Sequence, residues 1–148
     1  MNSESTISPK STQRKRPKLV WVITIFYFIS VGWTLFSFAS IYSGFIPVNE
    51  AQAIYFKSQT IIDILFTIVI GLLNIVGAIF LFLLRRSAFY LFLSAFVFGL
   101  ILTVYHIIFK NWLAAIAGPG LIGAIIGWSI AIATILYATK LIRAEILN

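Results

Sequence analysis

Two ionisable side chains stand out because they lie in or beside long apolar stretches. Asp63 is the one acid so placed, and His106 is the chain's one histidine. Ionisable residues within a membrane are rare and costly, so each is a candidate functional residue. A carboxylate beside an imidazole titrates near neutral pH, which suits a gate or an ion-entry site. The alternatives are an interfacial structural pair, two separately solvated groups, or a catalytic role.

Asn74 is the third polar residue of interest. It lies about ten residues, or roughly 15 Å of helix, from the end of its apolar stretch, and so near mid-membrane. An unpaired amide there is costly, so it must bond a neighbouring helix or line a wet cavity. We therefore expect Asn74 either to hold helices together through a hydrogen bond or to contact a substrate.

Enzymatic signatures are absent from the sequence. There is no Gly-x-Ser-x-Gly elbow and no phosphate-binding glycine loop. Aspartyl chemistry within the membrane needs two acids, and Asp63 stands alone. The chain has no cysteine, one histidine and four carboxylates, which leaves few options for a metal site. We expect no catalytic residue, no metal and no cofactor.

Composition indicates a membrane protein. The chain of 148 residues is 61% hydrophobic and 10% charged, whereas soluble domains carry about 25% charged residues. The excess of 11 Lys and Arg over 4 Asp and Glu could suggest nucleic acid. The charges sit at the ends of apolar runs rather than on one surface, so we expect no nucleic-acid partner.

Four apolar runs predict an all-α protein, a four-transmembrane-helix bundle of up-down-up-down topology. The expected spans are 19–42, 59–84, 87–109 and 113–139, within a membrane domain of residues 19–148. Residues 1–18 are polar and basic, and we expect a disordered cytoplasmic tail.

Two connections carry local signals. Asn49, Glu50 and Gln52 match a helix start, which predicts a short helix over 50–57 lying on the membrane surface through Tyr55 and Phe56. Gly118-Pro119-Gly120 breaks the last apolar run. Residues 112–117 are then either the start of a kinked helix or a separate interfacial segment, with the span beginning near Gly120; we favour the second.

Positive charge predicts the orientation. Nine Lys and Arg fall on one side of the predicted spans and two, Lys57 and Lys110, on the other. By the positive-inside rule, both termini are cytoplasmic. The residues that carry most of this signal are Arg14, Lys15, Arg16, Lys18, Arg85 and Arg86.

Small and polar residues predict the packed helix faces, because these residue types hold helices together in lipid. One stripe contains Asp63, Thr67, Gly71, Asn74 and Ala78, and another contains Ala95, Gly99, Thr103 and His106. Counted from the Arg85-Arg86 turn, the members pair off at similar depth. We expect the two stripes to face each other, with Gly71 against Gly99, and Asp63 and His106 to lie at the outer interface.

The last span carries a further ridge of small residues at Gly123, Gly127 and Ala131. Such a ridge suits tight helix contact, either within the bundle or with a second copy. We therefore expect the lipid bilayer as partner, together with a homo-oligomer or another membrane protein.

The segments RPKLVWVITIFYFISVGWTLFSF, NEAQAIYF and GPGLIGAIIGW resemble small four-span bacterial inner-membrane proteins of unknown function. This resemblance implies a fold and a bacterial inner-membrane location, but no activity. Two characterised layouts match poorly. Small multidrug transporters need a glutamate in the first span, which has none, and small fluoride channels have a dual topology that the charge bias opposes.

The leading hypothesis is a non-enzymatic accessory or structural subunit of the inner membrane. An oligomeric small-solute or ion transporter is the alternative, with Asn74 along the path and Asp63 with His106 at its outer mouth. Below Asn74 the second span offers only Gly77 and Ala78 before Leu84, so the polar path is interrupted. A lipid-modifying enzyme ranks third.

Overall fold

The computed structural model describes residues 17–147. The helices are α1 (Lys18–Tyr42), α2 (Glu50–Ser58), α3 (Ile61–Phe82), α4 (Ser87–Phe109), α5 (Trp112–Ala115) and α6 (Pro119–Arg143). Four of them, α1, α3, α4 and α6, are long and apolar enough to cross a membrane. The predicted all-α fold with a four-helix bundle is confirmed. The basic residues Arg14, Lys15 and Arg16, and most of the expected tail, lie outside the described residues.

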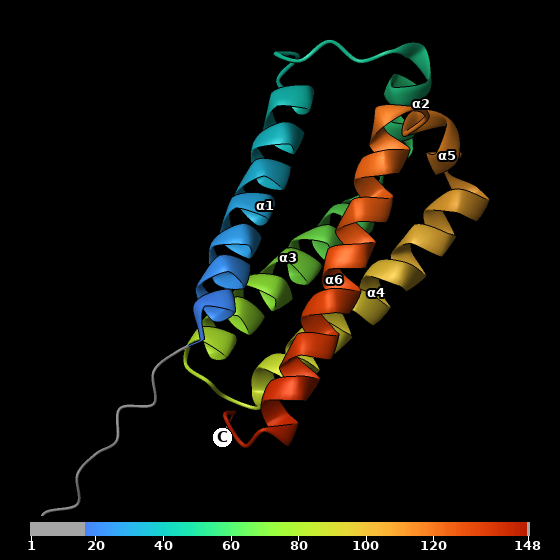
Figure 1. The fold of residues 1–148 in the computed structure, drawn as a ribbon. Coiled ribbons are helices and arrows are strands. Elements are labelled where there is room, and N and C mark those ends of the chain that lie inside the picture. Colours follow the sequence, from blue (N-terminus) through green and yellow to red (C-terminus); the bar gives the residue numbers. More distant parts are fainter. Residues whose placement is uncertain (1–16, 148) are drawn as a thin grey trace, which may run out of the picture.

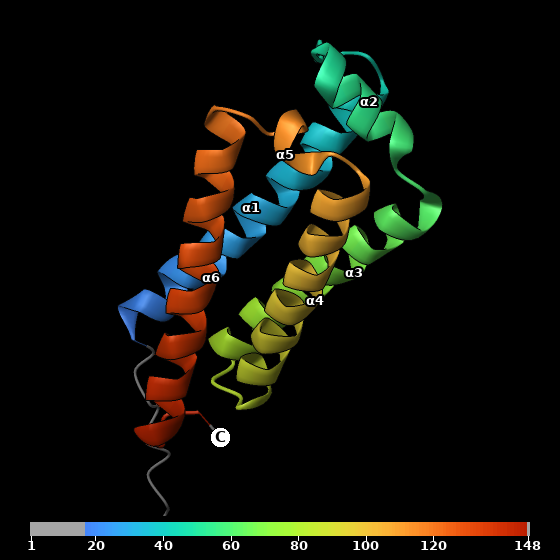
Figure 2. The same cartoon turned by 90° about the vertical axis from the view of Figure 1, so that its right-hand side faces the viewer.

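The four long helices alternate in direction (Figure 1). α3 packs against both α1 and α4, and α6 packs along α4. The short helices α2 and α5 lie together at one end of the bundle, hereafter the loop end. The opposite end, hereafter the terminal end, contains the start of α1, the turn between α3 and α4, and the end of α6. In the view of Figure 2, α1 and α6 cross near the terminal end and diverge towards the loop end.

Local sequence sets the start of α2, and its predicted capping box is confirmed. The Asn49 side chain accepts from the Gln52 backbone N–H at 2.8 Å, and the Gln52 side chain accepts from the Asn49 N–H at 3.1 Å. The expectation that Tyr55 rests on the membrane surface is wrong. Tyr55 is buried and points at α4, because its hydroxyl has a hydrogen-bond partner there.

The glycine-proline break separates two helices, as favoured from the sequence. α5 ends at Ala115, and α6 begins at Pro119 after Gly118, whose φ is 76°. A positive φ is unstrained in glycine, so Gly118 can redirect the chain between the two helices. The last span extends to Arg143, a few residues beyond the expected end.

The hydrophobic core lies at the terminal end. Its buried members come from all four long helices and from the segment after α6: Val20, Tyr27, Ala78, Leu81, Ala88, Phe92, Leu141 and Leu147. Leu147 is fully buried, and its carbonyl oxygen accepts from Nε of Arg86 at 3.0 Å. The chain after α6 therefore folds back under the bundle and is fastened to the turn between α3 and α4.

The predicted contact between Gly71 and Gly99 is wrong. A Cβ at Gly71 would meet Val31 of α1 at 3.4 Å, and a Cβ at Gly99 would meet none of the described residues within 4 Å. The close approach of α3 to α4 occurs instead at Gly77, where a Cβ would lie 3.2 Å from the Phe92 ring. Gly123 and Gly127 likewise have open space at the Cβ position, so their ridge makes no tight contact with the described part of the chain.

Candidate functional site

Asp63 lies in the first turn of α3 and caps the helix it belongs to. Its Oδ2 accepts from the Thr60 backbone N–H at 2.7 Å and from the Thr60 hydroxyl at 2.8 Å, while the Asp63 N–H donates back to that hydroxyl at 3.3 Å. This second capping box starts α3 and fixes the carboxylate. The negative charge also lies where the helix dipole favours it.

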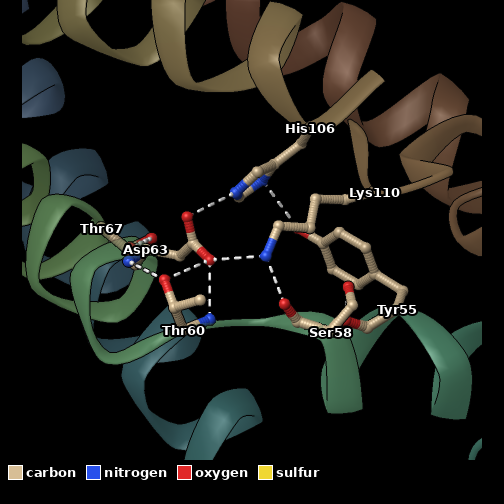
Figure 3. A network of polar contacts seen from close by, with 7 residues as sticks. All are labelled: Tyr55, Ser58, Thr60, Asp63, Thr67, His106 and Lys110. Atoms are coloured by element: carbon tan, nitrogen blue, oxygen red, sulfur yellow. Dashed lines mark hydrogen bonds and ion pairs between the residues drawn. The ribbon is translucent and has the colours of Figure 1, made fainter. Parts of the chain in front are cut away.

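Lys110 brings a positive charge to the same oxygen from the end of α4. Its Nζ lies 3.0 Å from Oδ2 of Asp63, and the two side chains are only 9% and 5% exposed. Nζ also donates to the backbone carbonyl of Ser58, at the end of α2 (Figure 3). Lys110 therefore joins three elements, α2, α3 and α4, through one ammonium group.

His106 lies one helical turn before Lys110 and contacts the other carboxylate oxygen. Its Nε2 is 3.5 Å from Oδ1 of Asp63, and its Nδ1 is 3.0 Å from the Tyr55 hydroxyl of α2 (Figure 3). Burial raises the pKa of Tyr55 to about 12, so the phenol keeps its proton at neutral pH. The tautomer of the His106 ring decides which of the two groups donates the hydrogen bond between them.

We call Tyr55, Thr60, Asp63, His106 and Lys110 the polar clamp. Its charged and polar groups are mostly directed at one another, and Asp63 and His106 are 4% and 5% exposed. A buried charge is tolerated when it is paired and hydrogen-bonded, as Asp63 is here. The clamp thus fastens the α2 connection to α3 and α4 at the loop end.

A hollow lies beside the clamp on the outer surface of α3 and α4. It has a volume of about 430 Å³, and Thr60 and Asp63 line it together with apolar side chains: Ile62, Phe66, Phe98, Ile101, Leu102 and Tyr105. Most of these side chains are exposed. In a membrane protein, such a surface suits lipid chains.

A second hollow lies inside the bundle and is lined by all four long helices. Its volume is about 240 Å³. Its polar lining comprises Ser30 of α1, Asn74 of α3 and Thr103 of α4, and its remaining lining includes Tyr27, Phe92, Phe96, Gly99, Gly127, Trp128 and Ala131. Tyr27 and Phe92 also belong to the buried core, which therefore closes this central hollow towards the terminal end.

Asn74 is half-buried and has no hydrogen-bond partner among the described residues. It lines the central hollow and also a hollow of about 220 Å³ between α1 and α3. The structure therefore places the Asn74 amide against cavities rather than in a hydrogen bond to a neighbouring helix. The hydroxyls of Thr34 and Thr67 instead bond the carbonyls of Ser30 and Asp63 in their own helices.

The predicted polar face and its glycine divide into three groups. Asp63 and His106 meet in the clamp, as their matching depths indicated, while Asn74 and Thr103 line the central hollow. Thr67 and Gly71 turn towards α1. The reason is helical geometry, since residues four apart rotate by about 40° beyond one full turn. A stripe at this spacing drifts around α3, which has neighbours on two sides.

Three clamp residues, Tyr55, Thr60 and Lys110, were not predicted as site residues. Lys110 was assigned to topology and Tyr55 to the membrane surface. The spacing carried a signal for Lys110, because it lies four residues after His106 and so on the same face of α4. No local signal identified Tyr55, since its contact with His106 depends on how the α2 connection folds back over α4.

The fold and these sites together define the class: an all-α membrane protein with a buried polar clamp at one end of the bundle and a hydrophobic core at the other. Among the described residues, no group of three or more His, Cys, Asp or Glu side chains is placed to hold a metal ion. No protein-family model, curated protein or solved structure matches the chain. This agrees with the expectation that no characterised family would match.

Proposed function

We propose that this chain is a non-enzymatic, multi-pass protein of the bacterial inner membrane that serves as an accessory or interaction subunit. Both termini face the cytoplasm in this proposal, so the clamp lies at the outer surface. The observation that carries the proposal is that the Asn74 amide has no hydrogen-bond partner among the described residues and lines a hollow that the buried core closes towards the terminal end.

The clamp supports a structural role over a catalytic one. A general acid or base needs a position where a reacting group can come within hydrogen-bond reach. The Oδ2 atom of Asp63 already accepts from Thr60 and Lys110, and Nδ1 of His106 faces Tyr55. If the chain were an enzyme, the apolar hollow beside Asp63 would make lipid its substrate class. The polar groups that line this hollow, Thr60 and Asp63, are however already engaged in structural hydrogen bonds.

The hydrophobic core argues against transport in this conformation. A transporter needs a continuous polar path, and the residues beneath the central hollow are mostly apolar or aromatic, with Thr134 as a buried polar residue among them. Ala78 and Leu81 are fully buried, and Phe92 is 2% exposed. An oligomeric small-solute or ion transporter remains the second candidate, favoured by the polar lining of the hollow at Ser30, Asn74 and Thr103.

A single cysteine at Ala78 tests the two candidates against each other, because the natural chain has no cysteine. In permeabilised vesicles, an Ala78→Cys variant should resist a water-soluble maleimide, whereas a Lys57→Cys control at an exposed position should react fast. Comparable rates at the two positions would show that water reaches the core, and would favour transport over the proposed role.

A further inference from the structure

The central hollow lies beside an incompletely closed side of the bundle. Close packing joins α1 with α3, α3 with α4, and α4 with α6. α1 and α6 diverge towards the loop end in the view of Figure 2. Phe26 and Gly127, which line the hollow from these two helices, are exposed. The hollow can therefore be approached from the membrane between α1 and α6.

The lining is mostly apolar, but it includes three polar, uncharged side chains, Ser30, Asn74 and Thr103, that have no hydrogen-bond partner within the described part of the chain. The amide of Asn74 offers both donors and an acceptor, and the hydroxyl of Ser30, midway along α1, lies in the same lining. Lipid chains form no hydrogen bonds, so lipid leaves these groups unsatisfied at a cost of several kcal/mol each. The favoured occupant must carry polar groups of its own.

The space around Asn74 also permits a polypeptide backbone to approach closely. Gly99 and Gly127 line the same hollow, and a Cβ at either would meet no atom of residues 17–147 within 4 Å. Small residues allow transmembrane helices to come together, and polar side chains then bond across the contact. Open glycine positions and an unpaired amide thus occur side by side.

We infer that the opening between α1 and α6 is the docking site for a transmembrane helix of another protein, one that carries an uncharged hydrogen-bonding side chain at mid-membrane to pair with Asn74. This inference rests on the proposed function and names its interaction surface. An uncharged group fits because Ser30, Asn74 and Thr103 carry no charge for an ion to pair with.

Photo-crosslinking in native membranes tests the site. A benzophenone amino acid at Gly127 faces the hollow, and the same group at Ile101 is the matched control. Both positions lie eight residues from the loop end of their helices, but Ile101 is 61% exposed on the outer hollow. We expect Gly127 to crosslink to one apolar segment of a different protein, with a polar residue within a helical turn of the crosslinked position, and Ile101 not to.

Asn74 variants supply the second arm. Loss of one interhelical hydrogen bond should lower the crosslink yield of Asn74→Leu about threefold, and Asn74→Gln should restore part of it. Equal yields from Gly127 and Ile101, crosslinks to lipid or to a second copy alone, or no effect of Asn74→Leu would overturn the docking site. A hetero-complex in native mass spectra without a Gly127 crosslink would refute the docking site and leave the proposed function standing, whereas absence of any hetero-complex would refute both.

Discussion

Nζ of Lys110 lies 3.0 Å from Oδ2 of Asp63, and this pair joins the end of α4 to the start of α3 inside the protein rather than on its surface. Removing one partner of a buried pair leaves an uncompensated charge. We expect Lys110→Met to lower the free energy of unfolding by about 3 kcal/mol, measured by reversible unfolding in mixed micelles.

The pairing has a matched control in Lys57, which is exposed at the same end of the bundle. Lys57→Met should leave the free energy of unfolding nearly unchanged. Combining Lys110→Met with Asp63→Asn should recover part of the loss, because the double variant buries no unpaired charge. Equal effects of Lys57→Met and Lys110→Met would show that the pair is not a specific contact.

The Tyr55 hydroxyl contributes a pH-dependent part of the clamp's stability. Burial raises its pKa to about 12, above the value of about 10 in the unfolded chain, so folding favours the protonated phenol. The stabilising contribution is complete below pH 10 and is lost as the pH rises through 12. We expect Tyr55→Phe to destabilise the protein by about 1 kcal/mol at pH 8, with the difference from the natural chain shrinking above pH 10. A difference that stays constant up to pH 12 would argue against a buried phenol with a raised pKa.

The close approach at Gly77 predicts which glycine is needed for helix packing. A Cβ there would lie 3.2 Å from the ring of Phe92, which is itself buried and cannot easily yield. Gly77→Ala should therefore destabilise the protein by about 1 kcal/mol. Gly99→Ala should be neutral or stabilising, because alanine favours the helix and meets no neighbour. If Gly99→Ala lowered the thermal unfolding temperature more than Gly77→Ala, the result would instead support the Gly71–Gly99 packing predicted from the sequence.

The fastening of Leu147 depends on one of two adjacent arginines. Nε of Arg86 donates to the Leu147 carbonyl, whereas the guanidinium of Arg85 lies over the Phe80 ring. We expect Arg86→Gln to speed hydrogen exchange at the Leu147 amide about fivefold, the equivalent of about 1 kcal/mol for one hydrogen bond. Arg85→Gln should change it little. Equal acceleration in both variants would mean that net charge, rather than this contact, holds the segment.

Much of the fold could be predicted from the sequence because its signals are local. Apolar length gave the four long helices, the Asn49–Gln52 pattern gave the start of α2, and the Gly118-Pro119-Gly120 break separated α5 from α6. Depth along two antiparallel helices follows from counting residues out from their shared turn. That count placed Asp63 and His106 at similar heights, and they do meet.

Rotation about the helix axis was harder to predict than depth. α3 has neighbours on two sides, so small residues face α1 at Gly71 and α4 at Gly77, and spacing alone does not distinguish these directions. Tyr55 reaches His106 through the fold of a connection whose course no periodic pattern encodes. Lys110 was read from its charge as a topology signal, although its buried position makes it a partner of Asp63.

Native mass spectrometry of the full chain, extracted in its own lipid, tests the proposed function most directly. The interaction role predicts a complex of fixed stoichiometry with a different membrane protein, weakened in the Asn74→Leu variant. A homo-oligomer of fixed size with no second protein would contradict that role and favour the transporter alternative.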